Sequence, residues 1–271
     1  LIQLLKASYS SVLIVGNSPM AISLIRALCQ TTCRLYVLSH MRDEYSNHGV
    51  DRAKLVFITA GELLPFIDLA FLVGSEQKEE KIAMVAEWEA KLPSTTCLAV
   101  TSDSVPLTTL QQGLSQPDRC LIVNWTTPVE TTLFCEIVYN EQVAYKHVEQ
   151  LESFAKVALR KDPHSIKGEI GYRGRLLASL VREAAFLIDQ QYATIEDIDR
   201  ACRNDSGYYL PFAGNLRYMD LMGTYAYGKV MEELNPELDN STTLSEAFKN
   251  RVQVSQEGET LIHGFYSYEA G

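Results

Sequence analysis

The feature that most constrains the fold is an alternation, through the first half of the chain, of short apolar runs with segments of helical periodicity. Residues 19–29 and 78–92 are the helical segments, and each carries apolar side chains along one face. The apolar runs are residues 11–15, 34–38, 55–58, 69–73, 96–100, 120–123 and 133–138. Strands that are apolar at nearly every position are covered on both faces, so the pattern predicts a mostly parallel sheet with crossover helices.

The pattern changes near Asn140, beyond which helical periodicity dominates. Thr194 followed by Asp197 is typical of a helix start, because the hydroxyl caps and the acid suits the positive helix end. Further helices are expected at residues 143–159, 173–190, 215–233 and 244–250, with a loop at 207–214. The predicted fold class is therefore α/β, with a Rossmann-type mostly parallel sheet over residues 1–140 and an all-helical C-terminal domain over residues 141–271.

Composition narrows the classes of partner. Hydrophobic residues make up 46% of the chain and the net charge is −10. An acidic surface disfavours nucleic acid and anionic membrane as partners. No apolar run reaches membrane-spanning length, and residues 1–16 lack the basic region and cleavage site of a secretory leader. We therefore expect a cytoplasmic protein that binds neither nucleic acid nor membrane.

The six cysteines are scattered, and most lie in the apolar runs. This placement favours small core side chains in a reducing compartment over disulfides. Cys29 and Cys33 form the nearest approach to a metal clip, but no second Cys or His pair answers them. We therefore expect no metal site.

A turn that suits nucleotide binding follows the first predicted strand, where the chain reads Gly16-Asn17-Ser18-Pro19-Met20-Ala21. A dinucleotide fingerprint places three glycines here, for the tight turn, for the approach of the pyrophosphate and for helix packing. Only Gly16 is retained, while Ser18 and Ala21 occupy the other two positions. Pro19 suits the first helical position. A turn that binds nothing remains the alternative.

The end of the second predicted strand bears on the choice of cofactor. An acid there would hold the ribose 2′-hydroxyl of NAD, but the chain reads Ser39-His40-Met41-Arg42. A small hydroxyl followed by Arg42 suits a 2′-phosphate, so both NAD and NADP stay open as cofactors. The alternative for Arg42 is an ordinary solvated charge.

The whole chain resembles the 3-hydroxyacyl-CoA dehydrogenase family. The similarity is spread over several segments: Asp68 to Glu76 followed by Lys81, Leu98 to Ser104, Asp118 to Cys120, Tyr192 to Asp199, Gly207-Tyr208 with Pro211-Phe212 and Asp220, and Gly264 to Tyr268. The resemblance implies that Glu76 and Lys81 lie beside the cofactor, and we expect Gly74 and Thr101 to line the same cleft. It also implies a hydroxyacyl-CoA substrate and a homodimer formed through the helical domain.

The family's catalytic positions are largely replaced. The resemblance implies a His–Glu pair, in which the His takes the proton of the 3-hydroxyl and the Glu orients it. Glu136 matches the Glu, but Asn124 stands where the His belongs, and asparagine is no general base. Asp103 stands at the substrate-binding Ser, and Gly174 at the active-site Asn. The segment that contacts CoA is also much shortened, to residues 41–54.

These replacements leave two functional hypotheses. One is an NAD(P)-dependent oxidoreductase with weak or altered activity, acting on a smaller hydroxy or oxo substrate. The other is a catalytically inactive homologue that serves as a nucleotide-binding, regulatory or structural dimer. A homodimer is expected in either case, because residues 173–190 carry a wide apolar arc and tyrosines follow it.

Two residue types compete for the role of the missing base. Asp103 either forms a coupled carboxylate pair with Glu136 or caps the short helix that follows, and the cap is favoured. The chain has five histidines: His40, His48, His147, His164 and His263. Only His40 and His48, in the loop on the expected cofactor side, are candidates for the cleft, and the other three are expected on the surface.

Overall fold

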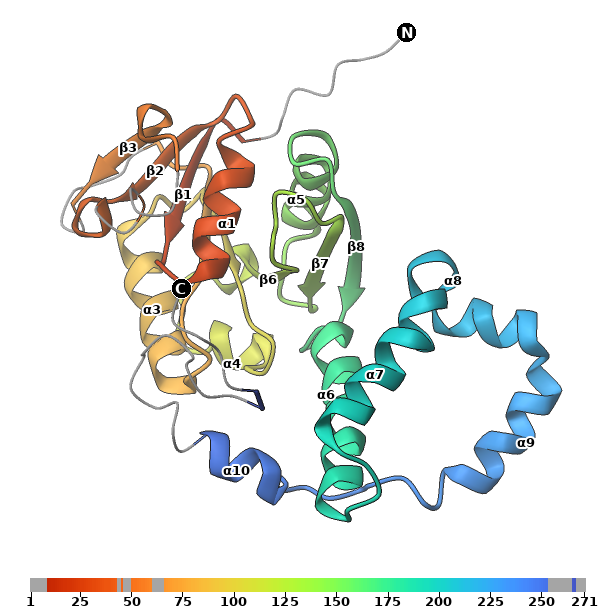
Figure 1. Ribbon diagram of the computed structural model, residues 1–271. Coiled ribbons are helices and arrows are strands. Elements are labelled where there is room, and N and C mark those ends of the chain that lie inside the picture. Colours follow the sequence, from red (N-terminus) through yellow and green to blue (C-terminus); the bar gives the residue numbers. More distant parts are fainter. Residues whose placement is uncertain (1–8, 43–44, 46–49, 60–65, 253–264, 267–271) are drawn as a thin grey trace, which may run out of the picture. The chain divides into compact units, whose positions relative to one another are not determined.

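The first half of the protein is built on one eight-stranded sheet with the strand order β3-β2-β1-β4-β5-β6-β7-β8 (Figure 1). The computed structural model describes residues 9–42, 45, 50–59, 66–252 and 265–266. Neighbouring strands are parallel except β6 and β7, which pair antiparallel. The strands are β1 Ser11–Val15, β2 Arg34–Leu38, β3 Leu55–Ile58, β4 Leu69–Leu72, β5 Cys97–Val100, β6 Cys120–Trp125, β7 Phe134–Tyr139 and β8 Asp162–Lys167.

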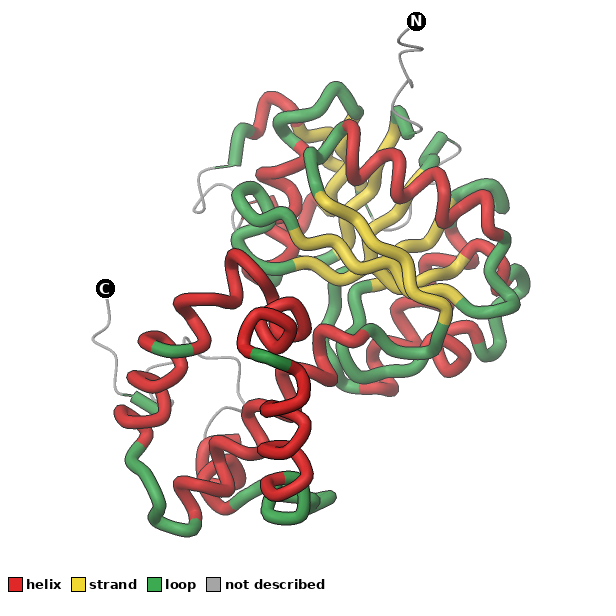
Figure 2. The backbone as a smooth tube through the Cα atoms, turned by 90° about the vertical axis from the view of Figure 1, so that its right-hand side faces the viewer, coloured by secondary structure: helices red, strands yellow, loops and turns green. Residues whose placement is uncertain are grey.

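The core lies along the central strands, as the apolar runs predict. Every residue of β4, β5 and β6 is buried. The helices that connect the strands are α1 Pro19–Leu28, α3 Lys78–Lys91, α4 Leu107–Gln111 and α5 Tyr145–Val157. Figure 2 shows the strands grouped as a single sheet. The α/β fold class and the Rossmann-type sheet are confirmed.

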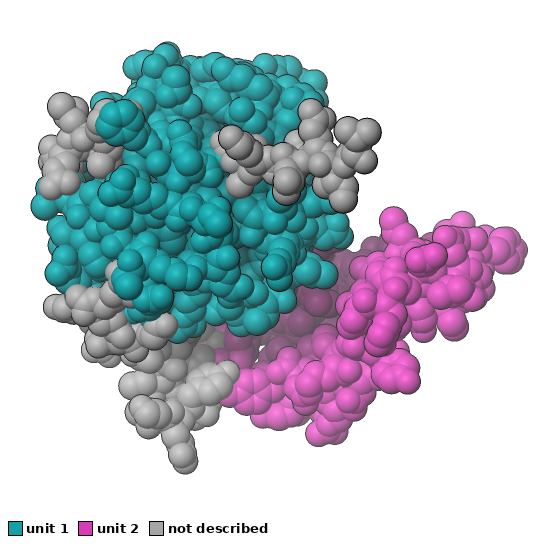
Figure 3. Space-filling model, turned by 90° about the horizontal axis from the view of Figure 1, so that it is seen from above, with its two compact units in different colours: residues 1–174 teal, residues 175–271 magenta. Residues whose placement is uncertain are grey.

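The described residues of the second half form the helices α6 Tyr172–Asp189, α7 Ile195–Asn204, α8 Ser206–Met222, α9 Thr224–Leu234 and α10 Glu246–Val252. The chain divides into two compact units, residues 1–174 and residues 175–271, rather than near Asn140 (Figure 3). The division falls later because β8 extends the sheet beyond β7, and α5 packs on β7 and β8.

Two segments differ from the sequence-based expectation. Residues 207–214 form part of α8 rather than a loop; Pro211 lies inside this helix, and the backbone breaks at Gly214 with φ 71°. The expected helix at 215–233 is interrupted at Gly223, with φ 98°, where α8 gives way to α9. Glycine tolerates both left-handed conformations, so the chain bends there without a steric penalty.

Three cysteines lie one on each of three adjacent strands of the sheet. Cys97 of β5, Cys120 of β6 and Cys135 of β7 are buried free thiols. Burial raises the pKa of the Cys97 thiol to about 12, and it also raises the pKa of Cys120 and of Cys135. Within the described residues no cluster of His, Cys, Asp or Glu could hold a metal ion. None of the described helices is both long enough and apolar enough to span a membrane.

Candidate active site

The carboxyl ends of β1, β4, β5 and β6 meet at one edge of the sheet, and the strand order reverses between β1 and β4. Open α/β sheets bind ligands in the crevice at such a switch point. Gly16 follows β1, Gly74 lies just beyond β4, Thr101 follows β5, and Asn124 lies near the end of β6. The residues expected to line the cleft therefore lie at the carboxyl ends of neighbouring strands.

A glycine and a helix cap shape the turn after β1. Gly16 has φ +134°, and a Cβ atom at this position would lie 2.1 Å from the carbonyl oxygen of Val73, so only glycine fits. Ser18 is the N-cap of α1, and its Oγ accepts a hydrogen bond of 3.3 Å from the Ala21 amide. Pro19 begins the helix, and Asn17 before the cap is exposed. The N-terminus of α1 is thus capped, and its positive dipole end lies at the carboxyl end of β1.

An ion pair links the ends of β4 and β5. The buried ammonium of Lys81 lies 2.9 Å from Glu76 Oε1 and donates a hydrogen bond to the Thr101 carbonyl. Glu76 Oε2 accepts from the Ser104 hydroxyl at 2.8 Å. The Thr101 hydroxyl is buried and has no partner among the described residues. A buried hydroxyl of this kind, at the carboxyl end of β5, is suited to a ligand that brings its own hydrogen-bonding groups.

The segment after β2 contacts the turn that follows β1. Ser39 begins a short 3-10 turn, and the Arg42 guanidinium lies 4.3 Å from the ring centre of Phe57. Tyr45, which the sequence analysis did not single out, is buried and donates a hydrogen bond of 2.9 Å to the Gly16 carbonyl. His48 lies outside the described residues. Tyr45 therefore supports the glycine turn from a segment that carries no recognisable motif.

Asn124 and Glu136 form the centre of the site, paired directly across β6 and β7. The Asn124 Nδ2 group donates to the Ser102 carbonyl at 3.0 Å and to Glu136 Oε2 at 3.1 Å. Its Oδ1 atom accepts from the Ser102 amide at 3.1 Å. Both N–H donors of the amide are therefore used within the protein, and the side chain is buried.

Glu136 is a fully buried carboxylate that holds the start of α6. Its Oε1 atom accepts from the Tyr172 amide at 2.9 Å and from the Arg173 amide at 3.1 Å. A Cβ atom on Gly171 would lie 1.7 Å from Glu136 Oε2, so the chain must carry glycine there. Free amides at a helix N-terminus stabilise a negative charge. The hydrogen bonds from these amides replace those to water that Glu136 loses on burial.

Neither expected role of Asp103 is found. The Asp103 carboxylate pairs with the Arg173 guanidinium at 3.0 and 3.1 Å, and Pro106 rather than Asp103 precedes α4. No coupled carboxylate pair forms, because Glu136 bonds to amides instead. Gly174 packs against Asp103, with 3.1 Å between a built Cβ and the Asp103 carbonyl oxygen.

Comparison with known proteins identifies the family. The model described as 3-hydroxyacyl-CoA dehydrogenase, NAD binding domain, matches residues 51–168, and that of the C-terminal domain matches residues 172–268. This chain belongs to the 3-hydroxyacyl-CoA dehydrogenase family. The match to the NAD-binding model begins after the Gly16 turn, which has only one of the three fingerprint glycines.

Two relatives of different named activity are similar to this chain in sequence. The 5-formyl-3-hydroxy-2-methylpyridine 4-carboxylate 5-dehydrogenase of Mesorhizobium japonicum is 25% identical over 179 residues, which cover 64% of this chain and 56% of that protein. The mitochondrial hydroxyacyl-coenzyme A dehydrogenase of Sus scrofa is 28% identical over 178 residues, which cover 64% of this chain and 55% of that protein. The alignments thus span little more than half the length of these relatives.

Solved structures show the same fold. A 5-formyl-3-hydroxy-2-methylpyridine 4-carboxylic acid 5-dehydrogenase, described as an NAD+-dependent dismutase, has a TM-score of 0.84 at 19% identity, covering 96% of this chain and 91% of that chain. A 3-hydroxyacyl-CoA dehydrogenase from Archaeoglobus fulgidus has a TM-score of 0.74 at 21% identity, covering 97% and 93%. Their chains combine a Rossmann-type domain with a helical C-terminal domain.

Within the family's site, one histidine lies beside Glu136, contrary to the sequence-based expectation. His164 of β8 is the register partner of Glu136 of β7. Its position was not predictable from periodicity, because residues 162–167 lack the apolar run of a buried strand. His147 lies in α5 and His40 in the turn after β2, while His263 is outside the described residues.

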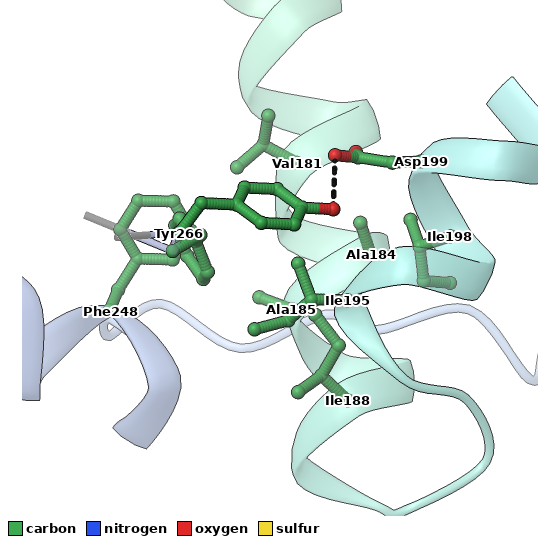
Figure 4. A pocket seen from close by; sticks show the side chains of 10 residues that line it. Val181, Ala184, Ala185, Ile188, Ile195, Ile198, Asp199, Phe248 and Tyr266 are labelled. Atoms are coloured by element: carbon green, nitrogen blue, oxygen red, sulfur yellow. Dashed lines mark hydrogen bonds between the residues drawn. The ribbon is translucent and has the colours of Figure 1, made fainter. Parts of the chain in front are cut away.

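A separate apolar cavity of 680 Å³ lies within the second unit (Figure 4). Ala184 and Ile188 of α6 line it together with Ile195 and Ile198 of α7, and the Tyr266 hydroxyl donates a hydrogen bond of 2.9 Å to Asp199. Tyr266 and Phe265 are the described part of the terminal motif that resembles the family; Gly264, Ser267 and Tyr268 lie outside the described residues. The cavity offers one polar pair and no arrangement for catalysis.

Proposed function

We propose that this chain is a nucleotide-dependent oxidoreductase of the 3-hydroxyacyl-CoA dehydrogenase family whose activity on 3-hydroxyacyl-CoA is weak or altered. The observation that carries the proposal is the bonding of Asn124. The amide at the position of the family's histidine takes no proton at neutral pH, and its N–H donors are spent on Ser102 and Glu136. General acid–base help is typically worth about 10² to 10⁴ in rate.

The nucleotide part of the proposal rests on the crevice. Gly16, the capped start of α1 and the unpaired Thr101 hydroxyl suit the pyrophosphate and sugar of a dinucleotide. When bound, NAD or NADP would supply the hydride acceptor. Since Ser39 replaces the acid and Arg42 lies nearby, we expect no strong preference for NAD over NADP.

The substrate part rests on the shortened connection between β2 and β3. Only residues 39–54 separate these strands, whereas the family resemblance implies a long excursion that contacts CoA. A smaller hydroxy or oxo substrate therefore fits this chain better than an acyl-CoA. The second candidate is a homologue that binds nucleotide without catalysis, and the loss of the base at Asn124 is the observation that favours it.

Two measurements test the proposal. Calorimetric titration with NAD, NADH, NADP and NADPH should show binding of all four with similar dissociation constants. Wild type and Asn124→His are then compared on acetoacetyl-CoA with NADH, after thermal unfolding has verified that both are folded. We expect slow turnover in the wild type and a gain of about 10² or more on restoring the histidine.

The outcomes separate the candidates. Robust wild-type turnover of acetoacetyl-CoA would refute the proposed loss of activity. Binding of nucleotide without turnover of any hydroxy or oxo compound would favour the non-catalytic homologue. Absence of nucleotide binding would leave a structural dimer.

A further inference from the structure

A row of three polar side chains crosses the sheet at the site. The strand register pairs Asn124 of β6 with Glu136 of β7, and Glu136 with His164 of β8. Register partners on neighbouring strands point to the same face of a sheet. His164 therefore flanks Glu136 on the side opposite to Asn124, on the face of the sheet that carries the Glu136 carboxylate.

The opposite face of β8 is covered differently, which fixes the direction of His164. The next residue along the strand, Ser165, hydrogen-bonds through its hydroxyl to Glu152 of α5. Successive side chains of a strand point to opposite faces. His164 thus points away from α5, toward Glu136 and the first turn of α6.

Two aromatic rings hold the imidazole in place. The Tyr172 ring stacks on it with 5.1 Å between ring centres and 18° between planes, and the Phe134 ring meets it edge-on at 5.2 Å. The Tyr172 amide also donates to Glu136, so a single residue contacts both members of the pair. Burial and the Glu136 charge raise the pKa of the Tyr172 hydroxyl, which therefore stays protonated at neutral pH.

One imidazole nitrogen has unmet bonding capacity. His164 Nε2 is buried and has no hydrogen-bond partner among the residues that the structure describes. A buried polar atom without a partner is costly and is often completed by water or by a ligand. Here the atom belongs to a side chain that can accept a proton, and that side chain lies next to the retained Glu136.

We propose that His164 replaces the missing histidine at position 124 as the proton acceptor of the site, so that the base has moved from one side of Glu136 to the other. The inference rests on the proposed oxidoreductase function and names the group that would carry it. The substrate is a small secondary alcohol, or the matching oxo compound in reverse. A bound oxidised nicotinamide supplies the hydride acceptor.

The balance of the step is simple. As hydride leaves the carbinol carbon for the nicotinamide, the O–H bond breaks, its electron pair forms the carbonyl, and the proton passes to His164. The resulting imidazolium lies one strand from the Glu136 carboxylate, which offsets its charge. Glu136 keeps its hydrogen bonds to Asn124 and to the first amides of α6 throughout.

The test compares His164→Gln with the wild type, Asn124→His and the double variant. His147→Gln is the matched control: His147 of α5 also has a buried nitrogen with no partner among the described residues, but it lies outside the row. Acetoacetate and acetoacetyl-CoA are the probes, with NADH as reductant. NADH binding and thermal unfolding are measured for every variant. Carbethoxylation of each histidine, followed by mass spectrometry, gives a readout that is independent of turnover.

We expect wild type to oxidise NADH with acetoacetate, and His164→Gln to lower this rate by about 10² to 10⁴ without loss of NADH binding. The His147→Gln control should retain the rate. Acetoacetate with NADH should slow the carbethoxylation of His164 at least fivefold, and that of His147 not at all.

Three results would overturn the assignment. They are an unchanged rate in His164→Gln, turnover only in variants that carry Asn124→His, and no turnover of either probe by wild type with NADH bound. The last result would be expected if the unpartnered nitrogen of His164 only binds a water molecule and takes no part in catalysis. Absence of NADH binding would instead refute the proposed function itself, so the two failures are distinguishable.

Discussion

At the scale of single residues, Glu136 shows how a buried charge is accommodated without a cationic partner. Three N–H donors reach its carboxylate, one from Asn124 and two from the first turn of α6. Charge-assisted hydrogen bonds of this kind are about twice as strong as neutral ones. The residue therefore anchors α6 to the sheet.

Gly171 tests this anchoring role. Gly171→Ala would place a methyl group 1.7 Å from Glu136 Oε2 and displace the carboxylate from its donors. We expect the free energy of unfolding to fall by about 3 to 5 kcal/mol, the range for an uncompensated buried charge. Urea denaturation measures this change.

Gly168→Ala is the matched control, since the nearest atom to its built Cβ is 4.0 Å away. Surface changes of this kind stay within about 0.5 kcal/mol. Equal destabilisation by the two substitutions would show that the Glu136 contact is not what makes Gly171 necessary.

His147 governs a second residue-scale prediction, the response of stability to acid. Burial, and secondarily the nearby Lys146 charge, lowers the pKa of His147 below its usual value of about 6.5. As pH falls below about 6.5, His147 becomes protonated in the unfolded chain but stays neutral in the folded chain. The free energy of unfolding therefore decreases as pH falls from 7 toward 5.

Denaturation at a series of pH values in this window checks the prediction. We expect His147→Gln to show a shallower decline than wild type, because the substituted side chain does not titrate. Exposed His40→Gln serves as the control and should follow the wild-type curve. Identical slopes in all three proteins would contradict the prediction.

The residues of the site were predictable to different degrees. Asn124 and Glu136 stand at positions that the family resemblance marks, and they pair in the structure. The partner of Asp103 was not predictable, because Arg173 is distant in sequence and belongs to a separate element. His164 was missed because its role depends on the register of a strand that sequence periodicity did not reveal.

At the scale of elements, the buried strands were predicted within about two residues, since full burial leaves a continuous apolar run. The edge strand β8 was not, because its sequence Asp-Pro-His-Ser-Ile-Lys is mostly polar and contains proline. Edge strands tolerate both features. The loop expected at residues 207–214 was wrong for the opposite reason, since Pro211 lies within α8.

Arg119 connects α3 to the sheet and carries the element-scale prediction. Its guanidinium donates to the carbonyls of Pro93, Thr96 and Glu89, and it lies 3.4 Å from the Glu89 carboxylate. Both side chains are buried. We expect Arg119→Met to cost about 3 to 5 kcal/mol, because buried Glu89 would lose its cationic partner and keep only the hydrogen bond from the Gln116 amide.

The pair of Lys91 and Glu87 on α3 is the control; the lysine is half-buried, the glutamate is exposed, and the two side chains lie 2.6 Å apart. Lys91→Met should cost at most about 1 kcal/mol. Thermal unfolding of both variants measures the difference. A small effect of Arg119→Met would show that Glu89 finds other donors or takes up a proton.

At the scale of the whole molecule, the second unit leaves an unusual amount of apolar side chain uncovered. Ala185 is the one buried hydrophobic residue described beyond residue 174. Leu216 is 82% exposed, Tyr225 81% and Phe212 85%. Patches of this kind mark interaction surfaces in proteins that are otherwise well packed.

We predict that this surface, on α8 and α9, forms a homodimer. Sedimentation at micromolar concentration should give twice the monomer mass for wild type. Leu216→Lys should shift the protein toward monomer, whereas Leu133→Lys, at a 64% exposed position of the first unit, should leave the dimer intact. A monomeric wild type, or a dimer insensitive to Leu216→Lys, would contradict the prediction.

The thiols of Cys97, Cys120 and Cys135 have a practical consequence for the study of this protein. Only the thiolate reacts with alkylating reagents, and these three groups are both inaccessible and hard to ionise in the folded sheet. Cys202 lies half-buried in α7, outside the sheet. The rate at which iodoacetamide labels each of the four cysteines would therefore report the opening of the sheet separately from that of the helices. No engineered probe is needed for this measurement.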